Sequence, residues 1–142
     1  MRKLLFIATA LLVMTSCDDK PVAPTELPQE VQTFIKQNFP SQTITFAQKD
    51  PEWIFFTQYE VTLNDGTQVS FDTDNVWDKV ESRTGAVPAA LVPQPIATYV
   101  NTNFPAVAIV KIDKESYGYE VELANELELK FNEGGALMEM DD

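Results

Sequence analysis

The sequence contains no histidine, a single cysteine and only five glycines, and each shortage excludes a class of function. Without histidine the chain cannot assemble a Ser-His-Asp or Cys-His nucleophilic group, or a histidine-containing zinc site. The glycines are too scattered for a phosphate-binding loop, since only Gly134 and Gly135 are adjacent. We therefore predict that the protein is not an enzyme, and that it uses no cofactor and no metal.

Basic residues are also few, because 10 Lys and Arg stand against 22 Asp and Glu, which gives a formal net charge of −12. Nucleic-acid binding depends on lysine and arginine to neutralise phosphates, so no nucleic-acid partner is expected. An anionic bilayer surface would repel the domain for the same reason. Solubility is the simplest reading of such a charge, and it requires no partner.

Long hydrophobic runs are absent apart from Leu4–Met14, which follows the basic residues Arg2 and Lys3. This run is shorter than the roughly 20 apolar residues of a transmembrane helix. Its layout is that of a secretory signal peptide, with the small residues Thr15 and Ser16 before the cleavage point. Residues 1–16 are therefore predicted to be a signal peptide.

Cys17 directly follows this segment, an arrangement that resembles the bacterial lipobox. We expect Cys17 to be lipidated, so that the protein is secreted across the inner membrane and anchored by lipid in the cell envelope. The anchored protein would lie at the periplasmic face or on the surface of the outer membrane. A free thiol, or cleavage nearby, is the alternative. Residues 18–26 are polar and contain two prolines, so residues 17–26 are predicted to form a flexible tether.

The rest of the chain contains an internal repeat. Motifs recur 65 residues apart and then 60 residues apart: Leu27-Pro28-Gln29 with Val92-Pro93-Gln94, Asn38-Phe39-Pro40 with Asn103-Phe104-Pro105, and Tyr59-Glu60-Val61 with Tyr119-Glu120-Val121. The five-residue difference falls at Pro51-Glu52-Trp53, which lengthens the first copy. We predict two copies, residues 27–86 and 87–142.

Each copy begins with an apolar stripe of helical spacing: Val31, Phe34, Ile35 and Phe39, then Ile96, Tyr99, Val100 and Phe104. Pro28 and Pro93 suit the first helical position, and Pro40 and Pro105 end the helices. Alternating strands follow. The predicted fold class is α+β, with two tandem units that each contain one helix and a four-stranded antiparallel sheet.

A three-residue loop after Leu63 brings the apolar positions of two strands onto one face, with Tyr59 opposite Phe71 and Val61 opposite Val69. Gly66 then occupies the left-handed position of the turn. Glu126 takes that place in the second copy, so the second turn is expected to differ in shape.

Carboxylates are the remaining chemical resource. Glu122 and Glu128 face each other on predicted strands, either as a site for acid–base chemistry or a cation, or as part of a solvated face. Asp72, Asp74 and Asp78 resemble a calcium loop only superficially, because the EF-hand spacing is missing. An aromatic cluster near Trp53 and Phe56 is either a protein-contact patch or packing between the copies.

The doubled pattern Leu-Pro, Phe-Ile, Asn-Phe-Pro, then Tyr-Glu-Val-x-Leu and Trp77-x-x-Val80 resembles the PepSY-like periplasmic lipoproteins of gut Bacteroidota. The resemblance covers residues 27–141, with Leu137 in place of tryptophan in the second copy. It implies a fold related to the β-lactamase inhibitory protein, in which sheets of tandem units line up. PepSY-type domains are associated with peptidase inhibition, but no inhibitory motif is matched here.

We therefore predict a non-catalytic lipoprotein that binds a protein of the envelope or exterior, or acts as an inhibitor-like module, through the open sheet face. The candidate contact residues are Trp53, Phe56, Gln58, Glu60, Gln68, Glu120, Glu122, Glu128 and Lys130. One alternative is a structural or accessory lipoprotein of an envelope complex. The other is a carboxylate-dependent hydrolase, which requires two carboxylates about 5–10 Å apart around a pocket.

Overall fold

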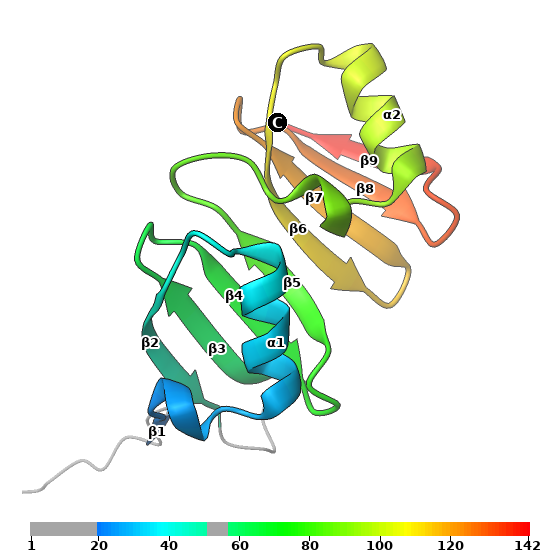
Figure 1. Ribbon diagram of the computed structural model, residues 1–142. Helices are drawn as coiled ribbons and strands as arrows, with labels where there is room; N and C mark the ends of the chain where they lie inside the picture. The colour runs from blue at the N-terminus through cyan, green and yellow to red at the C-terminus, as the bar shows by residue number, and fades with distance from the viewer. Residues whose placement is uncertain (1–19, 51–56) are drawn as a thin grey trace, which may run out of the picture.

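The computed structural model describes residues 20–50 and 57–142 (Figure 1). Two α-helices, two short 3-10 helices and nine strands form in the following order: β1 (Lys20–Pro21), η1 (Pro24–Glu26), α1 (Gln29–Asn38), β2 (Ile44–Lys49), β3 (Thr57–Leu63), β4 (Gln68–Asp72), β5 (Trp77–Glu81), η2 (Ala89–Leu91), α2 (Gln94–Asn103), β6 (Ile109–Glu115), β7 (Gly118–Leu123), β8 (Glu128–Asn132) and β9 (Leu137–Asp141). Among these described residues, no helix is long and apolar enough to span a membrane.

The strands form one antiparallel sheet in which each strand pairs with its neighbours in the chain, from β1 at one edge to β9 at the other. β5 pairs with β6 and so joins the N-terminal half (α1, β2–β5) to the C-terminal half (α2, β6–β9). At this seam Lys79 lies opposite Asp113, Val80 opposite Ile112 and Glu81 opposite Lys111. The prediction of two helices on antiparallel β-structure is confirmed, and the sheet is continuous across the two halves (Figure 1).

Both helices cover the same side of this sheet. The fully buried row runs across the strands through residues that pair with one another: Val61, Val69, Val80, Ile112, Val121 and Leu129, each with 0% of its surface exposed. Val31 and Ile35 of α1 and Ile96 and Val100 of α2 pack into the same core. Since a buried aliphatic side chain stabilises the fold by about 1.5–3 kcal/mol, this row contributes substantially to stability.

The helices end in the same way in both halves. The Asn38 amide donates to the carbonyl of Phe34 at 3.0 Å, and the Asn103 amide donates to the carbonyl of Tyr99 at 2.9 Å. Prolines follow at 40 and 105, which disfavours helical backbone at the preceding phenylalanines. At the helix starts the prediction was off by one residue, because Pro28 and Pro93 are N-caps of extended backbone conformation rather than the first helical residues.

The strand alternation is interrupted at matching places. The pairing register shifts at Thr45 in β2 and at Val110 in β6, and again at Asp78 in β5 and at Met138 in β9. These register shifts are β-bulges, in which one extra residue redirects the side chains that follow it. One consequence is that Phe46 pairs with Thr62, away from the helices, and is 46% exposed.

The turns after β3 and β7 have the same geometry, so the expectation that they differ was wrong. Gly66 has a φ of +85° and Glu126 a φ of +72°, both in the left-handed region. In each turn that residue's N–H donates to the carbonyl at the strand end, Leu63 or Leu123, at 2.9 Å. The paired strands on either side fix the turn, and Glu126 adopts a conformation that a glycine adopts without strain.

The start of the folded region also differs from the prediction. A flexible tether was expected over residues 17–26, but β1 pairs with β2, and the N–H of Val22 donates to the carbonyl of Ala47 at 2.9 Å. The 3-10 helix η1 follows directly. The tether was predicted from polar composition, which does not reveal that the backbone of residues 20–22 can form hydrogen bonds with the edge of β2. Cys17 and the rest of residues 1–19 lie outside the described residues.

Candidate functional site

The side of the sheet opposite the helices carries two rows of mostly polar side chains, which we call the open face. Pairing across the strands puts one row in the order Gln48, Glu60, Ser70, Lys79, Asp113, Glu120, Lys130 and Glu139. The second row is Phe46, Thr62, Gln68, Glu81, Lys111, Glu122, Glu128 and Asp141. Because successive residues of a strand point to opposite sides, both rows follow from the buried row between them.

Most of the predicted contact residues fall in these rows, namely Glu60, Gln68, Glu120, Glu122, Glu128 and Lys130. Gln58 lies in the register shift between Thr57 and Tyr59, so the pairing does not assign it to either row. Trp53 and Phe56 lie outside the described residues. The structure therefore brings together the two distant groups of candidates, from β3–β4 and from β7–β8, on one surface.

Sequence reasoning missed the open-face residues of β5, β6 and β9, which are Lys79, Glu81, Lys111, Asp113, Glu139 and Asp141. The alternation of Lys111 and Asp113 around the buried Ile112 is a signal that would have located two of them. In β5 and β9 the bulges at Asp78 and Met138 break the alternation, so simple period-two reasoning fails there.

The charge on the open face is concentrated in the C-terminal half. Its acidic members are Asp113, Glu120, Glu122, Glu128, Glu139 and Asp141, against Lys111 and Lys130. Lys111 contacts Asp113 at 3.2 Å, and Lys130 contacts both Glu139 and Asp141 at 3.4 Å. In the N-terminal half the rows contain Glu60, Lys79 and Glu81 among neutral polar side chains.

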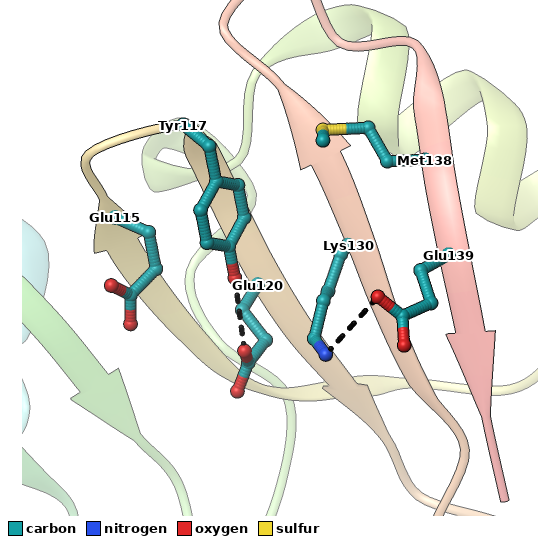
Figure 2. Close-up of a pocket in the computed structure, with 6 residues that line it drawn as sticks. All are labelled: Glu115, Tyr117, Glu120, Lys130, Met138 and Glu139. Atoms are coloured by element: carbon teal, nitrogen blue, oxygen red, sulfur yellow. Dashed lines mark hydrogen bonds and ion pairs between the residues drawn. The ribbon is translucent and has the colours of Figure 1, made fainter.

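A shallow depression of about 410 Å³ lies on this acidic half, lined by Glu115, Tyr117, Glu120, Lys130, Met138 and Glu139 (Figure 2). The Tyr117 hydroxyl donates to the Glu120 carboxylate at 3.1 Å. Burial, followed by the hydrogen bond to Glu120 and the negative charge of Glu120, raises the pKa of Tyr117 to about 12. The phenol therefore stays neutral, and the depression presents an aromatic ring and a thioether between carboxylates.

Two carboxyl groups near this depression, those of Glu115 and Glu128, have raised pKa values, so their ionised forms are disfavoured. The pKa of Glu128 is raised by partial burial and then by the negative charge of Glu120, and Glu128 pairs across the strands with Glu122. Burial and the charge of Asp113 raise the pKa of Glu115 in the same way. Both groups would gain from a nearby positive charge, because opposite charge favours the ionised form.

Of the three aspartates that superficially resemble a calcium loop, Asp72 ends β4, Asp74 lies in the turn that follows and Asp78 lies in β5. One oxygen of Asp72 accepts the N–H groups of Asp74 at 2.9 Å and Val76 at 3.0 Å. In the equivalent turn Asn132 accepts the N–H of Ala136 at 2.9 Å, so a neutral amide serves equally well. Over residues 20–50 and 57–142, no group of three or more Asp, Glu, Cys or His side chains could hold a metal ion.

The seam between the halves contains a cation–aromatic contact. The ammonium of Lys114 on β6 lies 3.9 Å from the centre of the Trp77 ring on β5. Burial lowers the pKa of Lys114, while Asp72 and Asp78 oppose that shift. Phe34 of α1 also packs against Trp77, at 6.3 Å between ring centres. Trp77 therefore contributes to packing between β5, β6 and α1 rather than to the open face.

These features define a class of protein, a single antiparallel sheet whose one face is closed by two helices and whose other face is polar. The chain matches the family described as "Putative beta-lactamase-inhibitor-like, PepSY-like" over residues 3–54 and 57–139. It therefore belongs to the PepSY-like family. No curated protein matches the chain.

Three solved structures from Bacteroides are similar to this chain over nearly their whole length. One is a "putative calcium-regulated periplasmic protein" from Bacteroides thetaiotaomicron, 36% identical with a TM-score of 0.82, covering 87% of this chain and 97% of its own. A "putative periplasmic protein" from Bacteroides vulgatus is 37% identical with a TM-score of 0.80, over 88% and 98%. A second from that species, "of unknown function", is 28% identical with a TM-score of 0.79, over 88% and 100%.

Proposed function

We propose that the protein is a non-catalytic binding module of the cell envelope whose open face holds a partner protein with a basic surface. The observation that carries the proposal is the pair of polar rows crossing the sheet, with the carboxylates gathered in the C-terminal half. A flat face with complementary charge favours fast and selective association with a protein of opposite sign. Tyr117 and Met138 add the aromatic and thioether contacts that interfaces favour.

The two halves are, in this proposal, copies of one unit of a helix and four strands. Matching bulges at Thr45 and Val110 and at Asp78 and Met138 support it, as do the matching turns at Gly66 and Glu126. Residues 27–86 and 87–142 are the proposed units. Joining them through β5 and β6 doubles the length of the open face, which suits a protein partner better than a small molecule.

The proposed location rests on the similar proteins and on the position of Cys17. The similar Bacteroides proteins are described as periplasmic. We propose in addition that Cys17 carries the lipid that holds the domain at the membrane. The Cys17→Ser variant should lose incorporation of radiolabelled palmitate and move from the membrane to the soluble fraction. Retention of label in that variant contradicts the anchor.

The face proposal is tested by crosslinking. A photo-crosslinking amino acid in place of Thr62 or Gln68 on the open face should capture a defined protein in cells, whereas one in place of the exposed Gln37 on α1 should not. Neutralising the face with Glu120→Gln, Glu122→Gln and Glu128→Gln should reduce capture at least several-fold and weaken its dependence on salt.

The matched control removes the same charge elsewhere, with Glu30→Gln, Glu126→Gln and Glu133→Gln at exposed positions outside the two rows. Capture should be unchanged in this control. Equal loss of capture in the two triple variants shows that net charge, not the open face, is responsible. Absence of a specific crosslink from both face positions removes the proposal.

The hydrolase alternative receives no support from the depression in Figure 2, although three carboxylates line it. Glu120 accepts a hydrogen bond from Tyr117, and Glu139 contacts Lys130. A glycosidase-type mechanism instead needs an acid and a base facing each other across the substrate. The accessory-lipoprotein alternative stays a prediction, which the crosslinking experiment also addresses through the identity of the captured protein.

A further inference from the structure

The two edges of the sheet are not alike, and β9 forms the longer exposed one (Figure 1). Within residues 20–50 and 57–142, β9 pairs with β8 alone. Its side chains include Met138, 57% exposed, and Met140, 46% exposed. A strand edge with unpaired backbone groups is a template for a further strand, and proteins usually protect such edges.

The molecule itself shows what such an edge accepts, because β5 occupies in the N-terminal half the place of β9 in the C-terminal half. β5 begins with Trp77 opposite Phe71, and β9 begins with Leu137 opposite Phe131. Each strand then has a one-residue bulge, at Asp78 or Met138. β6 pairs along the outer edge of β5 after the bulge, at Lys79, Val80 and Glu81. A strand of this shape therefore receives an antiparallel neighbour without adjustment.

Val80 and Met140 show the cost of leaving the edge unpaired. Both lie on the helix-covered side, opposite Val69 and Leu129 respectively. Val80 is 0% exposed, because Ile112 of β6 lies opposite it, whereas Met140 is 46% exposed. Burying the Met140 side chain under an incoming apolar residue would remove this apolar surface from water.

The charges specify the incoming strand further. On β5, Lys79 lies opposite Asp113 and Glu81 opposite Lys111, so the seam pairs opposite charges at both places. The equivalent residues of β9 are Glu139 and Asp141, which are both acidic. A complementary strand therefore carries one basic residue on each side of an apolar residue.

A second copy of this chain does not fit. Antiparallel pairing of two β9 strands centred on Met140 sets Glu139 of one copy against Asp141 of the other, at both ends. Like charges directly opposite each other destabilise a strand pair, and a chain with a net charge of −12 adds repulsion at longer range.

We propose that the outer edge of β9 is a second binding site, which adds an extended strand of a different protein with the pattern basic–apolar–basic. The site adjoins the open face and shares Glu139 and Asp141 with it, but it also uses the backbone groups at the sheet edge. Main-chain hydrogen bonds would supply the affinity, and Glu139, Met140 and Asp141 the selectivity. The proposal stands or falls independently of the open-face partner.

The probe for the test is a labelled peptide with the sequence of β6, Ile109–Glu115, carrying Asp113→Lys. Pairing it with β9 as β6 pairs with β5 sets lysines opposite Glu139 and Asp141 and the isoleucine opposite Met140. The control peptide carries Lys111→Glu and keeps the aspartate, so both charges are repelled. Fluorescence anisotropy at low salt should show about tenfold tighter binding of the basic peptide, since two cross-strand pairs change sign.

Protein variants identify the surface. Glu139→Lys with Asp141→Lys should reverse the preference, so that the acidic peptide binds more tightly. If this variant does not fold, Glu139→Gln with Asp141→Asn should reduce the preference from about tenfold to about threefold. The open-face variant Glu120→Gln with Glu122→Gln should keep the preference of the unmodified protein, which separates this proposal from the preceding one.

Amide hydrogen exchange provides the structural readout. The basic peptide should slow exchange along residues 137–141 and leave α1 unchanged. Equal affinity of the unmodified protein for the two peptides, protection confined to the open face, or an undiminished tenfold preference in the neutralised β9 variant overturns the proposal. So does a stable dimer of the free protein in which the β9 amides are protected, because the edge would then be occupied by a second copy.

Discussion

The two halves of the molecule have nearly the same buried side and very different open sides. Against the helices, Phe34 meets Phe71 edge to face at 5.4 Å, and Tyr99 meets Phe131 in the same way at 5.5 Å. On the open face, the N-terminal half is close to neutral, whereas carboxylates dominate the C-terminal half. The packing of the core constrains one side of each strand, and the other side is free to acquire a role in binding.

The halves also differ wherever one of them has a neighbour that the other lacks. Trp77 lies beside β6 and holds Lys114 over its ring, whereas Leu137 begins the edge strand β9. Lys49, which corresponds to Lys114, lies 5.9 Å from the ring of Tyr59. Tryptophan therefore occupies this position in β5, which has β6 of the other half as a neighbour, and leucine occupies it in the edge strand β9.

The largest predicted effect concerns the tight hairpin between β6 and β7 in the C-terminal half. Only Ser116 and Tyr117 connect β6 to β7, and Gly118 follows with a φ of +144°. A Cβ at Gly118 would lie 2.3 Å from the carbonyl oxygen of Phe131, so Gly118→Ala forces the backbone to move. We expect a loss of about 3 kcal/mol or more in the free energy of unfolding in urea.

Gly85→Ala is the matched control, because no atom lies within 4 Å of the added Cβ at that position. Its effect should be within about 0.5 kcal/mol. The difference in unfolding free energy between Gly118→Ala and Gly85→Ala measures the constraint that the tight hairpin imposes, because the control accounts for the general effect of replacing a glycine. Equal stabilities of the two variants would show that the close approach of Gly118 to β8 is not rigid.

The next largest effect is expected at the seam. Trp77→Leu makes the N-terminal half resemble the C-terminal half and should lower stability by about 2 kcal/mol, through lost aromatic packing and the lost contact with Lys114. A double-mutant cycle with Lys114→Met should give a coupling energy of about 1 kcal/mol. The cycle of Tyr59→Leu with Lys49→Met should give less than half of that, because the cation lies farther from the ring. Similar coupling in both cycles contradicts the special role of the seam.

The elements that could be predicted from sequence are those governed by the core. The helical stripes, the opposition of Tyr59 to Phe71 and of Glu122 to Glu128, and the residues on the open face of β7 and β8 follow from periodicity. Bulges escape this reasoning, because a single extra residue such as Asp78 leaves no mark in composition. The pairing of β1 also escaped it, since Lys20 and Pro21 form too short a strand to show any alternation of polar and apolar residues.

The turn after β7 provides a smaller effect of opposite sign. Glu126 adopts the left-handed conformation that Gly66 adopts in the other half, so Glu126→Gly should raise the free energy of unfolding by about 1 kcal/mol. Gly66→Ala should lower it by a similar amount, as the nearest obstacle to its Cβ is the flexible side chain of Arg83 at 3.4 Å. Thermal unfolding of the two variants checks both signs. A destabilised Glu126→Gly protein would mean that the glutamate side chain stabilises the turn by more than its strain.

The smallest predicted effect tests the open face itself. Glu128 faces Glu122, and partial burial and the charge of Glu120 raise its pKa, so the ionised form lowers the stability of the folded protein. Glu128→Gln should therefore stabilise the protein at pH 7 by about 0.2–0.5 kcal/mol. Because a carboxyl group with a raised pKa in the folded state stops destabilising when it is protonated, this gain should shrink as the pH falls through that raised pKa toward the ordinary value of 4.5. Glu133→Gln removes the same charge from an exposed turn and should show no such dependence on pH. If both variants show the same dependence of stability on pH, the carboxylates in the C-terminal half of the open face act through net charge alone. The local repulsion expected between Glu122 and Glu128 would then be absent.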